Sequence, residues 1–259
     1  MSQKNKMKVY QKLKFNHEGI TKEILFGSPD SKEEFEKMFS LRFDVYTENN
    51  YFHESFSRFK KRKDQDNYDL TGKCLYAIAV IDDGRIIGAV RLIRDKILPT
   101  EIFFKFDTPK KIEKISNTSR GEIGRLVVQP YSKSSFFPRN LILLFLLKTL
   151  FQVGYEAGVE GGYSFVKKSL LNKLRKLRVP VHLIGKYSQD YPADGALFNY
   201  FNQQDNPVFP TYFLTVEIEK YLANILNFKS RIIRREQDEK TFVLNDTLYT
   251  KFLRRMKVL

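Results

Sequence analysis

The chain has 259 residues, of which 42% are hydrophobic and 14% aromatic, with 23 Phe and no Trp. This composition excludes a chain that is disordered throughout, because such chains are poor in apolar and aromatic residues. The single cysteine, Cys74, excludes an internal disulfide and a cysteine-based metal cluster. A formal net charge of +15 indicates a polyanionic partner, and nucleic acid, anionic lipid and an acidic protein are all candidates.

The two ends of the chain are more basic than its middle. Residues 1–20 form a basic segment without a clear helix or strand pattern, residues 21–216 are predicted to form one folded domain, and residues 217–259 form a basic C-terminal extension. The first residues lack the apolar core of a secretory signal. The longest apolar run, 141–147, is far shorter than the ~20 residues of a membrane span. We therefore expect a cytoplasmic protein.

The first predicted element is a helix at 31–43. Ser31 can cap it, and Glu34 stands at capping-box spacing before an apolar face that includes Phe39. A polar and charged stretch at 49–70 follows and is predicted to be a long loop, and such loops often carry function.

Strands and helices alternate after this loop, and an Asp-Asp-Gly turn signal joins the first two strands. In chain order we predict strands at 74–81, 85–93 and 122–128, a strongly apolar helix at 141–157, a strand at 162–166, a basic helix at 169–177, and strands at 181–185 and 211–216. This order predicts a mixed α/β sheet with helices on its faces.

Charged residues recur in four short motifs that precede or lie on these strands. They are R-x-x-x-aromatic with Arg42 and Tyr46, followed by Phe52; D-x-x-D with Asp66 and Asp69; G-x-x-R-L with Arg91; and E-x-x-R with Glu122 and Arg125.

The order and spacing of the four motifs, over residues 35–130, resemble those of acyl-homoserine-lactone synthases, long-chain N-acyl amino acid synthases and exosortase-associated acyltransferases. The resemblance implies a GNAT-like α/β fold, with a mixed central sheet flanked by helices, and transfer of a fatty acyl group to an amine. Two residues depart from the pattern. Phe52 stands where the lactone synthases have Trp, and Gly124 stands where many relatives have Ser. The first departure favours an amino acid over S-adenosylmethionine as the acceptor.

In a regular strand Glu122 and Arg125 would face opposite sides of the sheet. The resemblance implies a β-bulge that brings both to one site, and Gly124 would tolerate the unusual backbone of such a bulge. Glu122 is then the predicted base, or the group that orients the attacking ammonium.

The other motif residues are predicted to surround this carboxylate. A wall of arginines and aspartates would order the loop and bind a substrate carboxylate, and two aromatic residues would contact the substrate. The wall comprises Arg42, Arg91, Arg125, Asp66 and Asp69, and the aromatic residues are Tyr46 and Phe52. A purely structural ion network is the alternative for these charges.

The acyl donor is predicted to bind where the 122–128 strand ends, at Val127, Val128, Lys133 and Arg139. The segment 131–140 lacks the glycines with which other GNAT enzymes hold the CoA pyrophosphate. This favours acyl-phosphopantetheine on an acyl carrier protein over acyl-CoA as the co-substrate, and no tightly bound cofactor is expected. No metal site is predicted either, because the three histidines are not at metal-ligand spacing.

A cluster of basic residues is predicted to dock the acidic carrier protein, and a solvated basic face is the alternative. The cluster comprises Lys167, Lys168, Lys173, Arg175, Lys176 and Arg178. The predicted function is thus an N-acyltransferase that acylates an amino acid or a similar small amine. Two alternatives stay open: an acyl-homoserine-lactone synthase that uses S-adenosylmethionine, and a non-catalytic module that binds nucleic acid or an anionic membrane surface. The absence of a nucleic-acid-binding motif disfavours nucleic acid.

Overall fold

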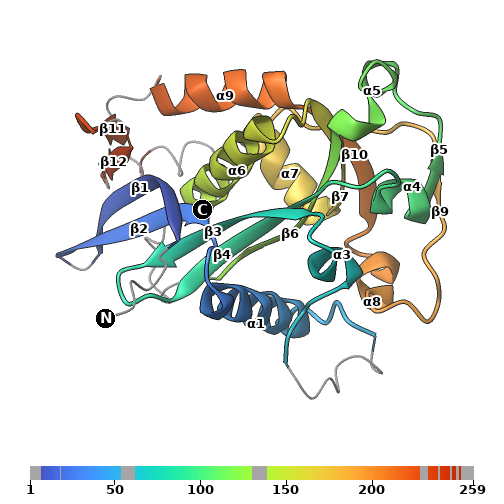
Figure 1. Cartoon of the computed structure of the whole chain (residues 1–259), viewed down its shortest axis with the longest axis horizontal. Coiled ribbons are helices and arrows are strands. Elements are labelled where there is room, and N and C mark those ends of the chain that lie inside the picture. The colour runs from blue at the N-terminus through green and yellow to red at the C-terminus, as the bar shows by residue number, and fades with distance from the viewer. Residues whose placement is uncertain are drawn as a thin grey trace.

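The computed structural model describes residues 7–17, 19–53, 62–129, 139–227, 233–238, 240–245, 247–248 and 251. Within them, one large mixed sheet runs through the molecule with helices on both faces (Figure 1). Its ten strands lie in the order β11-β12-β1-β2-β3-β4-β6-β7-β10-β8.

The strands of the large sheet differ widely in length. They are β1 (Lys8–His17), β2 (Ile20–Ser28), β3 (Cys74–Ile81), β4 (Ile86–Ile93), β6 (Arg120–Val128), β7 (Gly161–Lys167), β8 (His182–Leu183), β10 (Val208–Leu214), β11 (Ile233–Arg235) and β12 (Thr241–Leu244). A separate small sheet pairs β5 (Phe104–Phe106) with β9 (Tyr187–Gln189).

The helices cover the sheet in two layers (Figure 1). One face carries α6 (Arg139–Glu156), α7 (Lys168–Lys176) and α9 (Thr215–Asn227), and the opposite face carries α1 (Lys32–Glu48), α3 (Asn67–Leu70) and α8 (Phe198–Asn202). Three short elements lie between strands: α4 (Pro99–Phe103), α5 (Lys110–Glu113) and the 3-10 turn at Asn117–Ser119. None of the described helices combines the length and the apolar composition that crossing a membrane requires.

The helix α1 begins with the predicted capping box. The Ser31 side chain accepts from the backbone N–H of Glu34, and the Glu34 side chain accepts from the backbone N–H of Ser31. The helix continues to Glu48, five residues beyond the expected end at Phe43, because its buried face extends to Tyr46.

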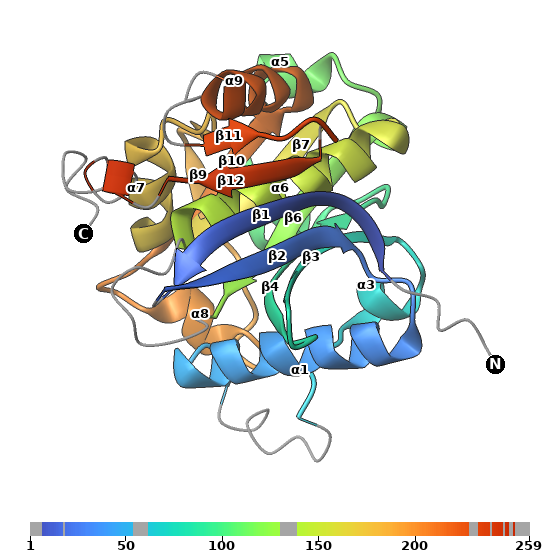
Figure 2. The same cartoon turned by 90° about the vertical axis from the view of Figure 1, so that its left-hand side faces the viewer.

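Both ends of the chain contribute strands to the large sheet, whereas the expectation was a basic segment on either side of a domain at 21–216. Residues 8–17 form β1, which pairs with β2, and β12 pairs in parallel with β1 (Figure 2). The divisions at residues 20 and 216 therefore fall at the start of β2 and inside α9. Buried Leu13 and Phe15 alternate with lysines along β1. Because this alternation is short and the outward residues are basic, the sequence pattern of the strand is weak.

The strands β6 and β7 are parallel and pair over a short length. Their pairs run from Arg120↔Gly161 to Glu122↔Tyr163 and then stop. The later residues of both strands line a common cavity instead. The end of this pairing therefore opens the middle of the sheet.

Two glycines bring these strands together at the pair Gly121↔Gly162. A Cβ atom on Gly162 would overlap the carbonyl oxygen of Gly121. We expect Gly162→Ala to lower the free energy of unfolding by about 1–3 kcal/mol, the usual cost of overpacking. Gly185→Ala is the matched control, because a Cβ there has no atom within 4 Å. Urea unfolding of both variants measures the difference, and equal stabilities would contradict this packing.

Candidate active site

Asp64 lies at the centre of a buried network of charges. Its Oδ2 accepts from Nε of Arg42 at 3.0 Å and from Nε of Arg125 at 2.7 Å. The backbone N–H of Asp64 donates to the carbonyl of Phe39 in α1, at 3.1 Å. Burial alone would raise the pKa of the Asp64 carboxyl, but the charges of Arg125 and Arg42 outweigh it and lower that pKa. Asp64 therefore stays ionised and joins the loop to both α1 and β6.

The D-x-x-D motif forms the second part of the network. Asp66 caps α3, and its Oδ1 accepts from the backbone N–H groups of Tyr68 and Asp69. Asp69 accepts both terminal nitrogens of Arg42, at 3.1 and 3.0 Å. Nη1 of Arg91 pairs with Asp66 at 2.7 Å and with Asp69 at 2.9 Å. Asp66 also accepts from Nη2 of Arg125 at 3.5 Å, so the motif binds one arginine each from α1, β4 and β6.

The predicted bulge is present in β6. Ala89 pairs with Val127 and Arg91 pairs with Gly124, so two residues of β6 oppose one residue of β4. The residue with the left-handed backbone is Arg125, at φ 55°, and not Gly124 as expected. A left-handed residue other than glycine costs about 1–2 kcal/mol, and the two hydrogen bonds from Arg125 to Asp64 hold it in place.

The bulge places Glu122 and Arg125 on the face of the sheet that α1 covers. Glu122 is 1% exposed, and one of its oxygens accepts the backbone N–H of Thr100 at 2.7 Å. None of the ion pairs among the described residues includes Glu122. Burial raises the pKa of Glu122 to about 8, although the Thr100 hydrogen bonds and the Arg91 charge act against it. Glu122 is therefore a carboxyl group that exchanges a proton near neutral pH.

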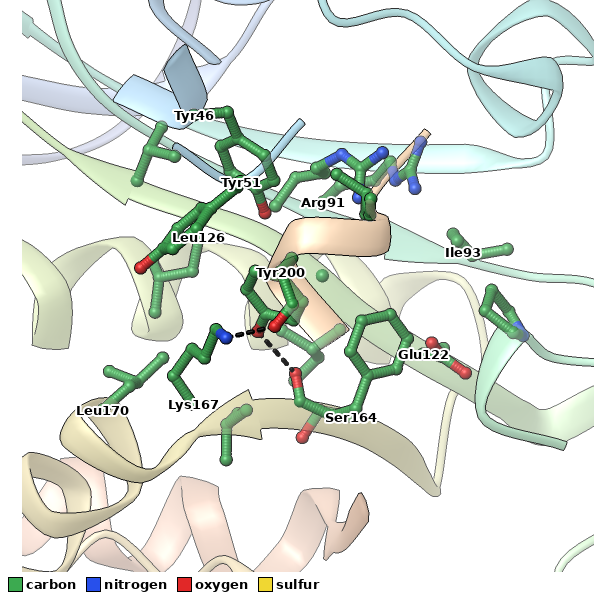
Figure 3. A pocket seen from close by; sticks show the side chains of 18 of the residues that line it. Tyr46, Tyr51, Arg91, Ile93, Glu122, Leu126, Ser164, Lys167, Leu170 and Tyr200 are labelled. Carbon is green, nitrogen blue, oxygen red and sulfur yellow. Dashed lines mark hydrogen bonds between the residues drawn. The ribbon is translucent and has the colours of Figure 1, made fainter. Parts of the chain in front are cut away.

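A cavity of about 450 Å³ connects this carboxyl group with the opposite face of the sheet. On the α1 face it is lined mainly by polar and aromatic residues: Tyr46, Tyr51, Asp66, Arg91, Glu122, Arg125, Lys167 and Tyr200. On the other face it is lined by apolar side chains of α6, α7, β10 and α9: Leu147, Phe151, Leu170, Leu174, Phe213 and Ile218. The cavity crosses the sheet where β6 and β7 no longer pair (Figure 3).

The predicted site residues have three different positions relative to this cavity. Those that line it are Tyr46, Asp66, Arg91, Glu122, Arg125, Val127 and Val128. Arg42 and Asp69 are buried in the charge network but do not line the cavity. Phe52 does not line it either; its ring packs on Phe43 and Tyr46 at 5.6 and 5.7 Å.

The structure does not support a donor-binding role for the two predicted cations, Lys133 and Arg139. Lys133 lies outside the described residues. Arg139 is described at the start of α6, where it is exposed and does not line the cavity.

Sequence reasoning missed Asp64 and Lys167. Asp64 precedes the D-x-x-D motif by two residues, so three acids within a lysine-rich stretch were the available signal. Lys167 was assigned to a basic cluster on the surface, but it is the last residue of β7 and is 3% exposed. It follows a run of buried strand residues, and strand alternation alone could have placed it beside Phe165 on one face.

We expect Asp64→Asn to lower the free energy of unfolding by about 3–5 kcal/mol, because it leaves two buried guanidinium groups short of a negative charge. The matched control is Asp44→Asn. Asp44 forms a solvent-exposed pair with Arg62, and such pairs contribute about 0–1 kcal/mol. Denaturant unfolding of the two variants provides the comparison. Equal and small effects would show that Asp64 does not hold the network together.

The segment that carries the four motifs matches a known protein family. The model of the family described as "Autoinducer synthase" matches residues 28–190, which include all four motifs. No match was found among curated proteins.

Solved structures similar to this chain include TofI in a ternary complex with an inhibitor and MTA, at 13% identity and TM-score 0.51, covering 77% of this chain and 95% of TofI. The AHL synthase LasI has 12% identity and TM-score 0.51, covering 78% and 94%. FeeM, an N-acyl amino acid synthase from uncultured soil microbes, has 11% identity and TM-score 0.51, covering 78% and 95%.

At these identities the structural likeness establishes the fold, and it confirms the predicted GNAT-like α/β architecture. The family match extends over more than half of the 259 residues. The chain therefore belongs to the autoinducer synthase family and is an acyltransferase.

Proposed function

We propose that this protein transfers a medium- or long-chain fatty acyl group from the pantetheine thioester of an acyl carrier protein to the amine of an amino acid. The observation that carries the proposal is the cavity that crosses the sheet. A buried carboxyl group and arginines lie at one end of it, and apolar side chains lie at the other. An amphiphilic product, polar at its amide end and apolar along its chain, fits this division.

The acceptor is proposed to bind between Glu122 and Arg91. Both residues line the cavity on the α1 face. Nε of Arg91 is buried and has no hydrogen-bond partner among the described residues. A carboxylate of the acceptor would satisfy that donor, and the ammonium beside it would be close to Glu122. This arrangement favours an α-amino acid, in which the two groups are separated by a single carbon.

The proposed reaction is nucleophilic attack of the amine on the thioester carbonyl carbon. Ionised Glu122 takes one proton from the ammonium, and the C–N bond forms. The C–S bond then breaks as a second proton passes from the nitrogen to the departing sulfur, which leaves as the pantetheine thiol. The carbonyl oxygen becomes negatively charged on the way. Backbone N–H groups of β6 beyond its last pair with β7 are suited to stabilise that charge, because they face the cavity edge where pairing has stopped.

The carrier protein is proposed to dock on α7. This helix contributes Leu170 and Leu174 to the apolar end of the cavity. Its outer side presents exposed Lys168, Arg175 and Lys176. An acidic carrier protein bound there would deliver its acyl arm beside the opening between β6 and β7, and complementary charge would speed the encounter.

Family membership supports a second acceptor, S-adenosylmethionine, which would give an acyl-homoserine lactone. The position of Phe52 favours the amino acid instead. Phe52 packs among aromatic side chains outside the cavity lining, so it offers no contact to an adenosyl group inside it.

The test is mass spectrometry of the products formed by the purified protein from a decanoyl carrier protein, a mixture of amino acids and S-adenosylmethionine. We expect an N-decanoyl amino acid. We expect Glu122→Gln to lower its rate of formation about 10²- to 10⁴-fold, the usual contribution of general base catalysis. Glu160→Gln, at an exposed glutamate, is the control and should keep full activity.

Decanoyl-homoserine lactone as the product would contradict the proposed acceptor and leave acyl transfer standing. A folded Glu122→Gln variant with undiminished turnover would contradict the role given to Glu122.

A further inference from the structure

A buried lysine lines the cavity without a part in the reaction above. Lys167 is 3% exposed and lies at the end of β7. Its ammonium donates to the backbone carbonyl of Tyr200 and lies 5.5 and 4.6 Å from the ring centroids of Tyr51 and Tyr200. Burial lowers the pKa of Lys167 to about 8. A buried ammonium is costly unless its N–H groups are bonded, so this position calls for a partner.

The described residues satisfy the Lys167 ammonium only in part. None of the ion pairs among them includes Lys167. The charge of Asp205 opposes the lowering of the Lys167 pKa, but it acts at longer range than an ion pair. An ammonium has three N–H donors. Within the described part of the chain, Tyr200 is the residue that accepts a hydrogen bond from Lys167. Lys167 lines the cavity and reaches toward Tyr200 in Figure 3, so a ligand in the cavity could accept from its remaining N–H groups.

Lys167 is too far from Glu122 to bind the acceptor. Glu122 pairs with Tyr163, four residues before Lys167 on the same strand. Four residues of β-strand span about 13 Å. Figure 3 shows Glu122 and Lys167 well apart in the cavity. An amino acid held between Glu122 and Arg91 does not reach Lys167, so the ligand of Lys167 belongs to the donor.

We propose that Lys167 binds the pantetheine arm of the acyl donor, at its second amide carbonyl and the neighbouring hydroxyl group. The inference rests on the proposed function. In an extended pantetheine thioester these two oxygens lie about 11–13 Å from the thioester carbonyl carbon, by addition of bond lengths. This span equals the distance along β7 from the level of Glu122 to Lys167. A hydrogen bond at Lys167 thus fixes the thioester at the level of the attacking amine.

The surroundings of Lys167 favour these neutral oxygens over a phosphate. A phosphate site at a helix start needs free backbone N–H groups. At the start of α7, the N–H of Lys168 donates to the carbonyl of Pro207, and the N–H of Ser169 donates to the side chain of Asn206, both at 2.9 Å. These two donors are occupied, and the lysine ammonium alone is suited to one or two carbonyl or hydroxyl oxygens.

The test compares decanoyl thioesters that contain increasing lengths of the arm. Decanoyl-N-acetylcysteamine ends at the first amide, decanoyl-pantetheine adds the second amide and the hydroxyl, and decanoyl-CoA and the decanoyl carrier protein share that same arm. The wild type should use decanoyl-pantetheine at least about tenfold better in kcat/KM than the shorter thioester. This first comparison needs no variant.

We expect Lys167→Met to lower kcat/KM for decanoyl-pantetheine about 10- to 100-fold, the effect of losing a hydrogen bond to a charged group. The loss should appear in KM more than in kcat, and it should be the same for decanoyl-CoA and the carrier-bound donor. Decanoyl-N-acetylcysteamine should be used as before. Lys167→Arg should recover most of the loss, and Lys114→Met, at an exposed lysine that does not line the cavity, should change nothing.

Several outcomes would overturn the inference. Equal losses for all donors would assign Lys167 a structural role. A loss confined to decanoyl-CoA would indicate recognition of its nucleotide, and a wild type indifferent to arm length would exclude a contact beyond the first amide. A wild type that transfers decanoate from none of the donors would instead contradict the proposed function itself, which separates the two failures.

Discussion

Three arginines and three aspartates meet between α1, the segment 62–69 and the strands β4 and β6, and they hold the site in one arrangement. Their side chains are buried, except that of Asp66, which is partly exposed. Each guanidinium contacts two of the carboxylates, and each carboxylate contacts two of the guanidinium groups. Charges buried in this way are tolerated only when they are paired and hydrogen-bonded. The network therefore fixes the loop on the sheet and keeps Arg125 in its left-handed conformation.

The same balance determines the chemistry. Because the arginines are neutralised by Asp64, Asp66 and Asp69, Glu122 lies beside them with no ion-pair partner among the described residues. Burial then dominates and raises the pKa of Glu122 to about 8. A carboxyl group with such a pKa is a stronger base than an exposed glutamate and suits proton removal from an ammonium. In the proposed reaction, the opening between β6 and β7 would give Glu122 access to a donor whose acyl chain lies on the apolar side of the sheet.

Much of this was predictable from the sequence, because local signals and the four motifs agree. The capping box of α1, the β3–β4 hairpin and the position of β6 follow from short-range patterns. The strands β1 and β12 do not, since their pairing is long-range and their outer residues are basic. Asp64 and Lys167 were missed for a related reason. Sequence spacing shows neither the fold of a loop onto a sheet nor the burial of a lysine at a strand end.

The proposed role of Glu122 as the proton acceptor is tested most directly by the pH dependence of kcat/KM for the acceptor, measured in the wild type and in Glu122→Gln. The folded-state pKa of Glu122 is raised, so its ionised form becomes abundant only above that value. We predict that kcat/KM of the wild type rises with pH along a titration curve whose midpoint lies at about pH 8, and that it levels off above that pH. This rise should be absent in the variant, apart from any titration of the acceptor's own amine. The same rise in both proteins would show that Glu122 does not accept the proton.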